Sequence, residues 1–122
     1  MIAYTTLGTR DLPRASRFYD ELLAELGAKR LMENERMVIW GTAMDAPMFA
    51  VCLPYDGQPS CVGNGSMISL VAASTEQVDA LYAKALVLGG SDEGRPGLRG
   101  PGFYLAYFRD PDGNKLNFFA PA

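Results

Sequence analysis

The stretch Y-F-R-D-P-D-G-N-K-L-N-F-F, from Tyr107 to Phe119, decides the fold of this chain. Its centre, Asp110 to Gly113, is a strong turn signal. Proline presets φ for the second turn position, the aspartates bond nearby backbone N–H groups, and glycine tolerates the positive φ that closes a turn. Because aromatic and branched residues lie on both sides, the stretch predicts a β-hairpin with a loop of about four or five residues.

The second strand of this hairpin has two different faces. Strand alternation puts Lys115, Asn117 and Phe119 on one face, and Leu116 and Phe118 on the other. Asn117 is therefore a neutral polar residue flanked by apolar ones.

The composition is that of an ordinary globular domain. The chain has 122 residues, 48% apolar and 20% charged, which suits one domain over residues 1–122. The net charge of −3 argues against nucleic acid or an anionic membrane as a partner, since both favour a basic surface. No run is long enough to span a membrane and no signal peptide opens the sequence, so the expected location is the cytoplasm.

Cysteine and histidine counts limit the chemistry. Cys52 and Cys61 are too few for a disulfide framework, which also favours a reducing compartment. The chain has no histidine. Its absence removes the usual general base, the usual partner of Ser and Cys nucleophiles, and the commonest transition-metal ligand.

The first half of the chain predicts a strand, a helix and three short strands. Residues 2–7 are rich in strand-forming types, and Asp11 is a good N-cap for an amphipathic helix that Gly27 ends. The three short strands are predicted at residues 29–32, 36–41 and 48–53. A Gly- and Pro-rich stretch, residues 54–63, is typical of a linker.

The second half repeats this order. Residues 65–73 predict a strand, and Ser74 with Gln77 resembles a capping box for a second helix that Gly89-Gly90 ends. The remaining predicted segments are a short strand at 91–93, a glycine-rich loop from Gly94 to Gly102, and hairpin strands at 103–109 and 115–120.

The two predicted helices align with each other. An offset of 63 (81 − 18) places Phe18-Tyr19 on Leu81-Tyr82, and the same offset places Tyr4 on Met67. Any two amphipathic helices can align to this degree, but the repeated order of elements favours a duplicated βαβββ unit. The sequence thus predicts an α+β fold whose modules, residues 1–55 and 64–122, are joined by a linker at 56–63.

Several motifs resemble one known family. Y-F-R-D-P-D-G-N-K-L-x-F resembles the C-terminal signature of the glyoxalase / bleomycin-resistance / extradiol-dioxygenase group, the vicinal oxygen chelate superfamily. T-L-G-T-R-D-L (residues 6–12) with F-Y-D (18–20), and G-N-G-S-M-I-S-L (63–70), resemble the openings of its two halves. The resemblance covers nearly the whole chain. It implies two βαβββ modules whose curved sheets form a half-barrel around a cavity.

The same resemblance bears on metal binding. Metal-dependent members take a His from the first strand of each half and a Glu from the last strand of each half. Those positions fall on Tyr4, Met67 and Asn117, and residues 48–53 contain no carboxylate. Cys52 could supply a thiolate but has no second strong ligand. Because hard divalent metals require carboxylates and imidazoles, we expect no metal and no cofactor.

The cavity that the resemblance implies would still be lined by residues of the predicted sheet faces. Such a wall, apolar and aromatic with a few hydroxyl and amide groups, is typical of a small-molecule pocket. The predicted ligand-binding residues are Tyr4, Thr6, Met67, Ser69, Tyr107, Asn117 and Phe119, with Trp40 as a further neighbour. The alternative is a collapsed core in which these side chains fill the space and Asn117 bonds to backbone.

Three further features could be functional or purely structural. Arg95 or Arg99 in the Gly94–Gly102 loop could close over an anionic ligand as a lid, or simply be solvated. Cys61 could be a redox-active thiol, although no neighbouring base or C-x-x-C motif supports that. Asp110 and Asp112 are better explained as turn-formers than as a catalytic pair.

Two classes of function follow. The first is a metal-free member that binds a small hydrophobic or aromatic molecule, as bleomycin-resistance proteins do. The second is an enzyme resembling lactoylglutathione lyase or a dioxygenase, whose chemistry needs a metal. A metal-free enzyme using Tyr4 or Cys52 as acid or base is a hypothesis from position alone, and no catalytic residue is assigned. The family resemblance also suggests a homodimer, in which two chains could share a cleft.

Overall fold

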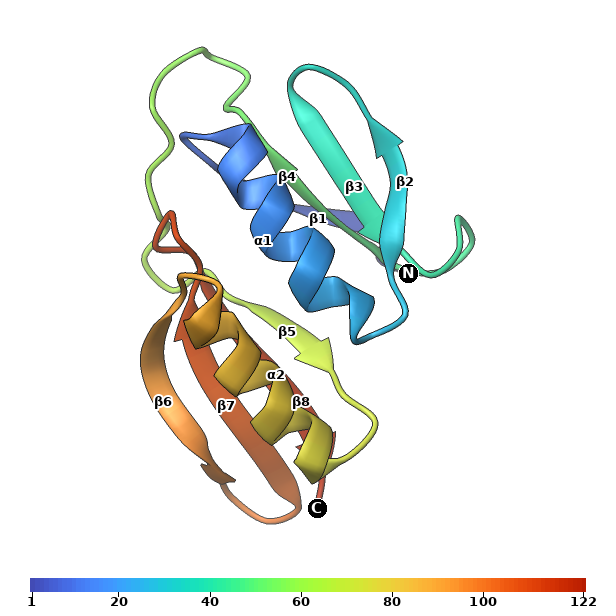
Figure 1. The fold of residues 1–122 in the computed structure, drawn as a ribbon, viewed down its shortest axis with the longest axis vertical. Helices are drawn as coiled ribbons and strands as arrows, with labels where there is room; N and C mark the ends of the chain where they lie inside the picture. Colours follow the sequence, from blue (N-terminus) through green and yellow to red (C-terminus); the bar gives the residue numbers. More distant parts are fainter. The chain divides into compact units, whose positions relative to one another are not determined.

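Each half of the chain folds as a strand, a helix and three further strands, which confirms the predicted βαβββ order (Figure 1). The computed structural model describes residues 1–122. The chain divides into two units, Met1–Val62 and Gly63–Ala122. The elements of the first unit are β1 (Tyr4–Gly8), α1 (Leu12–Ala24), β2 (Lys29–Glu33), β3 (Met37–Gly41) and β4 (Met48–Cys52). Those of the second unit are β5 (Ile68–Val71), α2 (Thr75–Val87), β6 (Ser91–Leu98), β7 (Phe103–Arg109) and β8 (Lys115–Pro121).

The two units share one sheet topology. The strand order is β1-β4-β3-β2 in the first sheet and β5-β8-β7-β6 in the second. In each sheet the first and last strands of the unit pair in parallel, and the other neighbours are antiparallel. This common topology supports the duplication and confirms the α+β class.

Both helices begin where the sequence predicts. The side chain of Asp11 accepts a hydrogen bond from the N–H of Arg14 at 3.0 Å, as an N-cap should. The Ser74 hydroxyl accepts from the N–H of Gln77 at 3.1 Å. In return, Oε1 of Gln77 accepts from the N–H of Ala73 at 2.7 Å, one residue earlier than in the standard capping box.

Each helix covers one face of its own sheet and forms a core there. In the first unit, the buried rings of Tyr19 and Trp40 lie 5.7 Å apart, and Phe49 lies 4.8 Å from Tyr19. In the second unit, Phe108 and Phe118 stack at 4.9 Å on the side of α2. These aromatic side chains supply a large part of the apolar burial that stabilises each unit.

The predicted hairpin turn is built around a buried aspartate. Oδ1 of Asp110 accepts from the N–H groups of Asp112 and Asn114, and Oδ2 accepts from the side-chain amide of Asn114 at 2.9 Å. Gly113 has a φ of 90°, which the turn requires and which glycine tolerates. Asp110 is thus a turn-former, as the sequence indicates.

The glycine-rich segment differs from its prediction. Residues 94–98, predicted as part of a loop, belong to β6, which pairs with β7 along the edge of the second sheet. Register shifts between Asp92 and Gly94, and between Gly94 and Gly97, interrupt this pairing. An edge position and bulges are what allow Pro96 and two glycines inside a strand. The loop proper is therefore only the short connection to β7.

The strand that opens the second unit is shorter than predicted. β5 begins at Ile68, not at residue 65, because Gly65 has a φ of 89° and Ser66 bonds back to Gly63 in a turn. Met67 consequently lies just before the strand.

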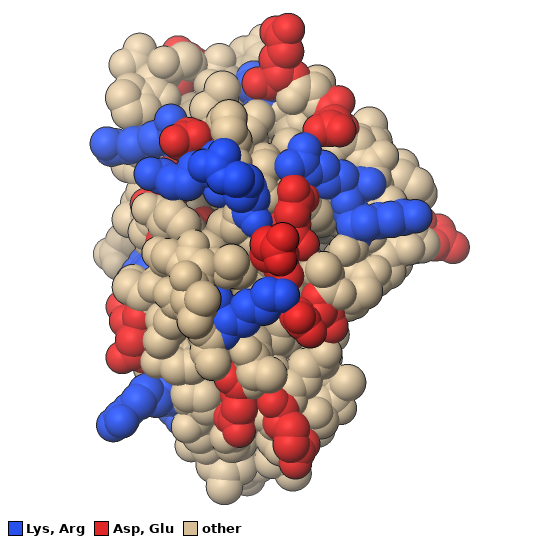
Figure 2. Space-filling view, viewed as in Figure 1, with Lys and Arg blue, Asp and Glu red and all other residues tan.

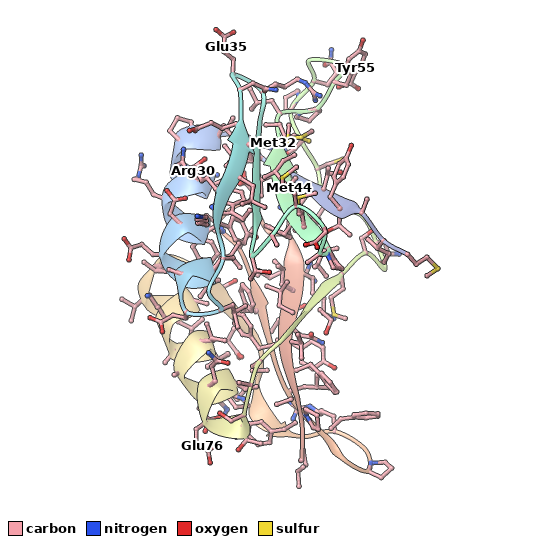
Figure 3. The ribbon with its side chains drawn as sticks, turned by 90° about the vertical axis from the view of Figure 1, so that its right-hand side faces the viewer. Arg30, Met32, Glu35, Met44, Tyr55 and Glu76 are labelled. Carbon is pink, nitrogen blue, oxygen red and sulfur yellow. The ribbon has the colours of Figure 1, made fainter.

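Several large side chains of the first unit are exposed. Figure 3 shows Met32 on β2 and Met44 and Tyr55 in the connections that flank β4. The guanidinium of Arg36 lies 5.4 Å from the centre of the Tyr55 ring.

Neither α1 nor α2 has the length and hydropathy that a membrane-spanning helix needs.

Candidate functional site

The sheet of the second unit has one face turned toward α2 and one turned away, and we call the latter the distal face. On β8, Leu116 and Phe118 point toward α2 and are fully buried. The alternate residues Lys115, Asn117 and Phe119 therefore lie on the distal face, as the strand pattern predicts. A hydrogen bond confirms which face meets α2. The hydroxyl of Tyr104, which lies on the same face of the sheet as Phe118, donates to Asp79 of α2.

A row of four residues crosses the distal face. Ser69 is paired with Asn117, Asn117 with Tyr107, and Tyr107 with Gly94, so the row spans all four strands. Directly opposed side chains of neighbouring strands lie about 4.5–5.5 Å apart at Cβ. The structure therefore brings together three of the predicted ligand-binding residues.

The adjacent position on β8 adds an aromatic patch to this face. Phe119 is paired with Val71 on one side and Leu105 on the other. Its ring lies 5.5 Å from that of Phe103, which is 48% exposed. Phe119, a fourth predicted residue, thus extends the row with an apolar surface.

Asn117 is the most unusual member of the row. The residue is only 3% exposed, and its Oδ1 is buried with no hydrogen-bond partner. Leaving a buried acceptor unpaired costs about 1–3 kcal/mol. The alternative in which Asn117 bonds to backbone does not hold for this oxygen. The atom is therefore an unsatisfied acceptor that neighbouring side chains cover, and a bound molecule would reach it only after those side chains move.

Tyr107 is flanked by two cations. The guanidinium carbon of Arg99 lies 5.8 Å from the centre of the Tyr107 ring, and Nζ of Lys115 lies 5.3 Å from it. Both distances are within the range of a cation–π interaction. The sequence suggested Arg99 only as part of a lid, and it did not single out Lys115.

A third basic residue near this row is already paired. Arg109 donates to Glu93 at 2.7 Å and to the carbonyl of Gly113 at 3.1 Å. The hydrogen bond from Arg109, with the charges of Arg109 and Lys115, lowers the pKa of the Glu93 carboxyl. Glu93 therefore stays ionised and holds Arg109.

The remaining predicted residues lie elsewhere. Tyr4 and Thr6 are exposed residues of β1 in the first unit, paired with Met48 and Ala50. Met67 is 39% exposed just before β5. For all three, a role in binding stays a prediction.

The expectation for Trp40 was wrong. Its side chain is buried on the α1 side of the first sheet, where Nε1 donates to Oδ1 of Asp20 at 2.9 Å. It therefore belongs to the core of the first unit and does not line a ligand site. The sequence pattern could not settle this, because both faces of β3 carry apolar residues.

The residues at the family's metal-binding positions do not fit a divalent metal. The two parallel strand pairs correspond in register, so Ser69–Asn117 in the second unit matches Thr6–Ala50 in the first. The last strands thus offer an amide and a methyl group where a metal site needs carboxylates. The structure contains no group of three or more His, Cys, Asp or Glu side chains that could hold a metal ion.

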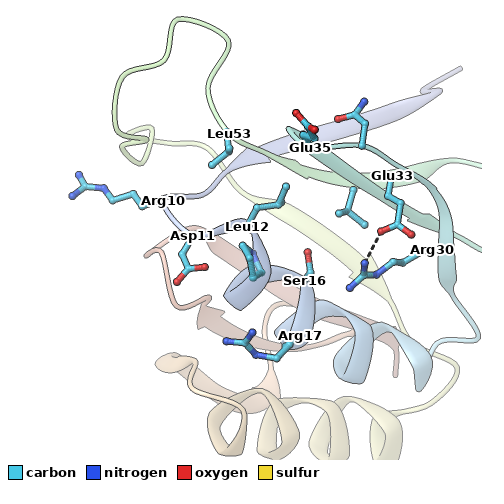
Figure 4. Close-up of a pocket in the computed structure, with 12 residues that line it drawn as sticks. Arg10, Asp11, Leu12, Ser16, Arg17, Arg30, Glu33, Glu35 and Leu53 are labelled. Atoms are coloured by element: carbon cyan, nitrogen blue, oxygen red, sulfur yellow. Dashed lines mark hydrogen bonds and ion pairs between the residues drawn. The ribbon is translucent and has the colours of Figure 1, made fainter.

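The first unit has a separate groove of about 650 Å³ (Figure 4). It lies between the start of α1 and the turn that joins β2 and β3, and sequence analysis did not anticipate it. Leu12, Val38 and Leu53 supply its apolar lining. Arg10, Arg17 and Arg30 with Asp11, Glu33 and Glu35 supply charges of both signs. Figure 2 shows the same mixture of basic and acidic side chains over this unit.

The charges in this groove are partly satisfied within the protein. Arg30 pairs with Asp20 and with Glu33, each at 2.7 Å. The hydrogen bond from Arg30, followed by that from Trp40, lowers the pKa of the Asp20 carboxyl against the opposing effect of burial. Two of the charged lining residues, Arg30 and Glu33, are therefore matched to each other within the protein.

Comparisons with known proteins agree with this fold. Residues 1–118 match the family model of the Glyoxalase/Bleomycin resistance protein/Dioxygenase superfamily. A glyoxalase/bleomycin resistance protein from Albidiferax ferrireducens T118 is 38% identical, with 98% of this chain and 97% of that chain covered and a TM-score of 0.89.

More distant structures share the fold alone. A glyoxalase/bleomycin resistance protein/dioxygenase family enzyme from Burkholderia phytofirmans PsJN is 18% identical, with 98% of each chain covered and a TM-score of 0.79. A lactoylglutathione lyase from Agrobacterium tumefaciens is 22% identical, with 98% of this chain and 92% of that chain covered and a TM-score of 0.72. The comparison with curated proteins finds no match. The family match and the Albidiferax structure establish that this chain belongs to the glyoxalase/bleomycin resistance protein/dioxygenase superfamily.

Proposed function

We propose that this protein binds a small aromatic or hydrophobic molecule on the distal face of the second sheet, without a metal. The observation that carries the proposal is the buried, unpartnered Oδ1 of Asn117. It stands where the family resemblance places a metal-binding glutamate. A neutral amide oxygen is a much weaker ligand than a carboxylate for Zn²⁺, Ni²⁺, Mn²⁺ or Fe²⁺, but it can accept a hydrogen bond from a ligand that displaces the side chains covering it.

The surroundings of Asn117 support an aromatic or apolar ligand. Tyr107 lies directly beside it, and the rings of Phe119 and Phe103 form an adjoining patch. Aromatic side chains bind flat ligands through offset stacking and edge contacts. Ser69, on the other side of Asn117, adds a hydroxyl that can donate or accept. A few polar groups in an apolar surround are typical of small-molecule sites.

The alternative function is a lyase or dioxygenase of the same superfamily. One structure of similar fold carries the name lactoylglutathione lyase, but at 22% identity it supports the fold and not the activity. Chemistry on vicinal oxygens in this family depends on a metal that acts as a Lewis acid. The donor set of this chain gives no support for that step.

Ligand binding can be tested by titrating the isotope-labelled protein with a library of neutral and charged aromatic fragments. Backbone amide signals of Ser69, Tyr107 and Asn117 are expected to shift together. Asn117→Leu removes the acceptor and keeps a similar shape. In this variant the fragments should bind about tenfold more weakly, as measured by the Kd from the titration. Asn64→Leu, in an exposed turn, is the matched control. The proposal fails if no fragment shifts signals of the distal face.

A further inference from the structure

We propose that the ligand of the distal face carries an oxyanion, a carboxylate or a phosphate-type group, bound by Arg99 and Lys115 beside the Tyr107 ring. This inference rests on the proposed function and names the chemical class of its ligand.

A hydrogen bond to the backbone holds the Arg99 side chain, and Gly97 leaves room for it. Its Nη2 donates to the carbonyl of Arg95 at 2.7 Å, which folds the side chain back over β6. A Cβ on Gly97 would lie 2.9 Å from Nη1, and one on Gly94 would lie 3.5 Å from Nη2. The guanidinium therefore occupies space that a side chain at position 97 would take, whereas at position 94 the added Cβ would be in ordinary contact with Arg99 and tight only against Tyr107, at 3.0 Å. The same placement brings it over Tyr107.

Neither cation beside Tyr107 forms an ion pair in the structure. Arg99 contacts a carbonyl and the ring, and Lys115 contacts the ring. The neighbouring acidic group Glu93 is bound to Arg109 at 2.7 Å and interacts with Lys115 only through its charge. Asp92, the chain neighbour of Glu93, is a second carboxylate at this edge, so Arg99, Arg109 and Lys115 exceed the two local carboxylates by one positive charge. Guanidinium N–H groups are well suited to bind carboxylate or phosphate oxygens.

Asn117 fixes the direction in which such a ligand lies. Its buried Oδ1 requires a donor and would repel an anionic oxygen. The acidic group must therefore lie toward Arg99 and Lys115, and an N–H or O–H of the same molecule must face Asn117. Tyr107 stands between Asn117 and Gly94 in the cross-strand row, with Arg99 over its ring, whereas Lys115 is the next residue of the distal face along β8 from Asn117.

The test uses matched sets of aromatic fragments, in which each carboxylic acid is compared with its primary amide and with the corresponding phosphonic acid. The full chain is titrated and observed through its backbone amide signals. The acids should shift the signals of Gly94, Tyr107 and Asn117, and should bind at least about fivefold more tightly than their amides. Comparison of carboxylic with phosphonic acids identifies which oxyanion is preferred.

Four charge variants separate a specific contact from general attraction. Arg99→Gln and Lys115→Gln should each weaken binding of the acids by about fivefold to tenfold and leave the amides unaffected. Arg36→Gln, which removes a guanidinium that lies over the Tyr55 ring, and Lys29→Gln remove the same charge from the first unit and should have no effect. Gly97→Ala provides a fifth variant, because its methyl group would displace the Arg99 guanidinium without changing any charge.

The outcomes distinguish this inference from the proposed function. If amides bind the distal face as tightly as acids, the inference is wrong and the proposed function stands. If acids bind but Arg99→Gln and Lys115→Gln act no differently from the two controls, the assigned contacts are wrong. If no fragment of any class binds this face, both proposals fall.

Discussion

Asn117 of β8 and Tyr107 of β7 are direct cross-strand partners, and they join a buried acceptor without a partner to a ring flanked by two cations. Each feature alone is an ordinary irregularity of a small domain. Side by side on one sheet face, they place an acceptor that needs a donor next to an aromatic ring and two cations. This arrangement predicts that a ligand places an N–H or O–H at Asn117 and an acidic group near the two cations.

Replacing Asn117 by leucine should not destabilise the protein. The substitution removes a buried acceptor whose unpaired state costs about 1–3 kcal/mol, while the added bulk opposes part of the gain. We expect the free energy of unfolding in urea to stay the same or rise by about 1 kcal/mol. A fall in the free energy of unfolding by more than about 1 kcal/mol would show that Oδ1 has a stabilising partner, such as an ordered water, in solution.

Metal content should remain low even under favourable conditions. After dialysis of the untagged protein against Zn²⁺, Ni²⁺, Mn²⁺ and Fe²⁺, elemental analysis should find less than about a tenth of a metal per chain, because amide, thioether and phenol groups do not make such a site. The tag must be removed because its histidines bind metal. A value near one metal per chain would move the enzyme alternative to first place.

Two glycines should respond differently to alanine. A Cβ on Gly90 would lie 2.8 Å from the carbonyl oxygens of both Ala85 and Arg109, which are backbone atoms and cannot move independently. Gly90→Ala should therefore lower the free energy of unfolding by about 2 kcal/mol. Gly97→Ala meets only the end of the Arg99 side chain and should change stability by less than about 0.5 kcal/mol. Equal effects in urea unfolding would contradict the packing described for Gly90.

The ion pair of Asp20 should contribute to acid sensitivity. Because Arg30 and Trp40 hold the folded pKa of Asp20 below its ordinary value, the carboxylate stabilises the fold above the unfolded pKa. That stabilisation is lost as the pH falls through the lowered folded pKa. Unfolding measured in urea between about pH 7 and pH 2 should therefore show a weaker acid loss in Asp20→Asn than in the native protein. Asp45→Asn, at an exposed position, should leave the pH dependence unchanged.

The helices and the C-terminal hairpin could be predicted from sequence because their caps and turn are formed by nearby residues and their apolar residues recur with the period of the element. Asp11 and Ser74 cap their helices, and the Asp110 turn forms the hairpin, through hydrogen bonds within a few residues. Such short-range interactions are visible in a sequence pattern. Asn117 could be found for the same reason, since strand alternation alone assigns its face.

The rest of the candidate site depends on long-range pairing. β6 looked like a loop because its glycines and proline disfavour a strand, and only its edge position and register shifts accommodate them. The placement of Arg99 over Tyr107 follows from those shifts, so alternation could not reveal it. In retrospect, the spacing of Gly94, Gly97 and Arg99 was the available signal. Trp40 was misplaced because an apolar strand does not show which face meets the helix.

The position of β8 inside its sheet has a consequence for how the chain folds. β5 joins the second sheet only through β8, although the two strands stand at opposite ends of that unit in the sequence. Closing such a distant parallel pair is slow, because the entropy of the intervening chain is lost before the contacts form. The first unit is complete once β4 has been synthesised, whereas β5 and the β6–β7 hairpin must wait for their common neighbour. During synthesis, the apolar strands of the second unit are thus the ones that need protection from aggregation, and any truncation that reaches β8 removes the middle of a sheet and not its edge.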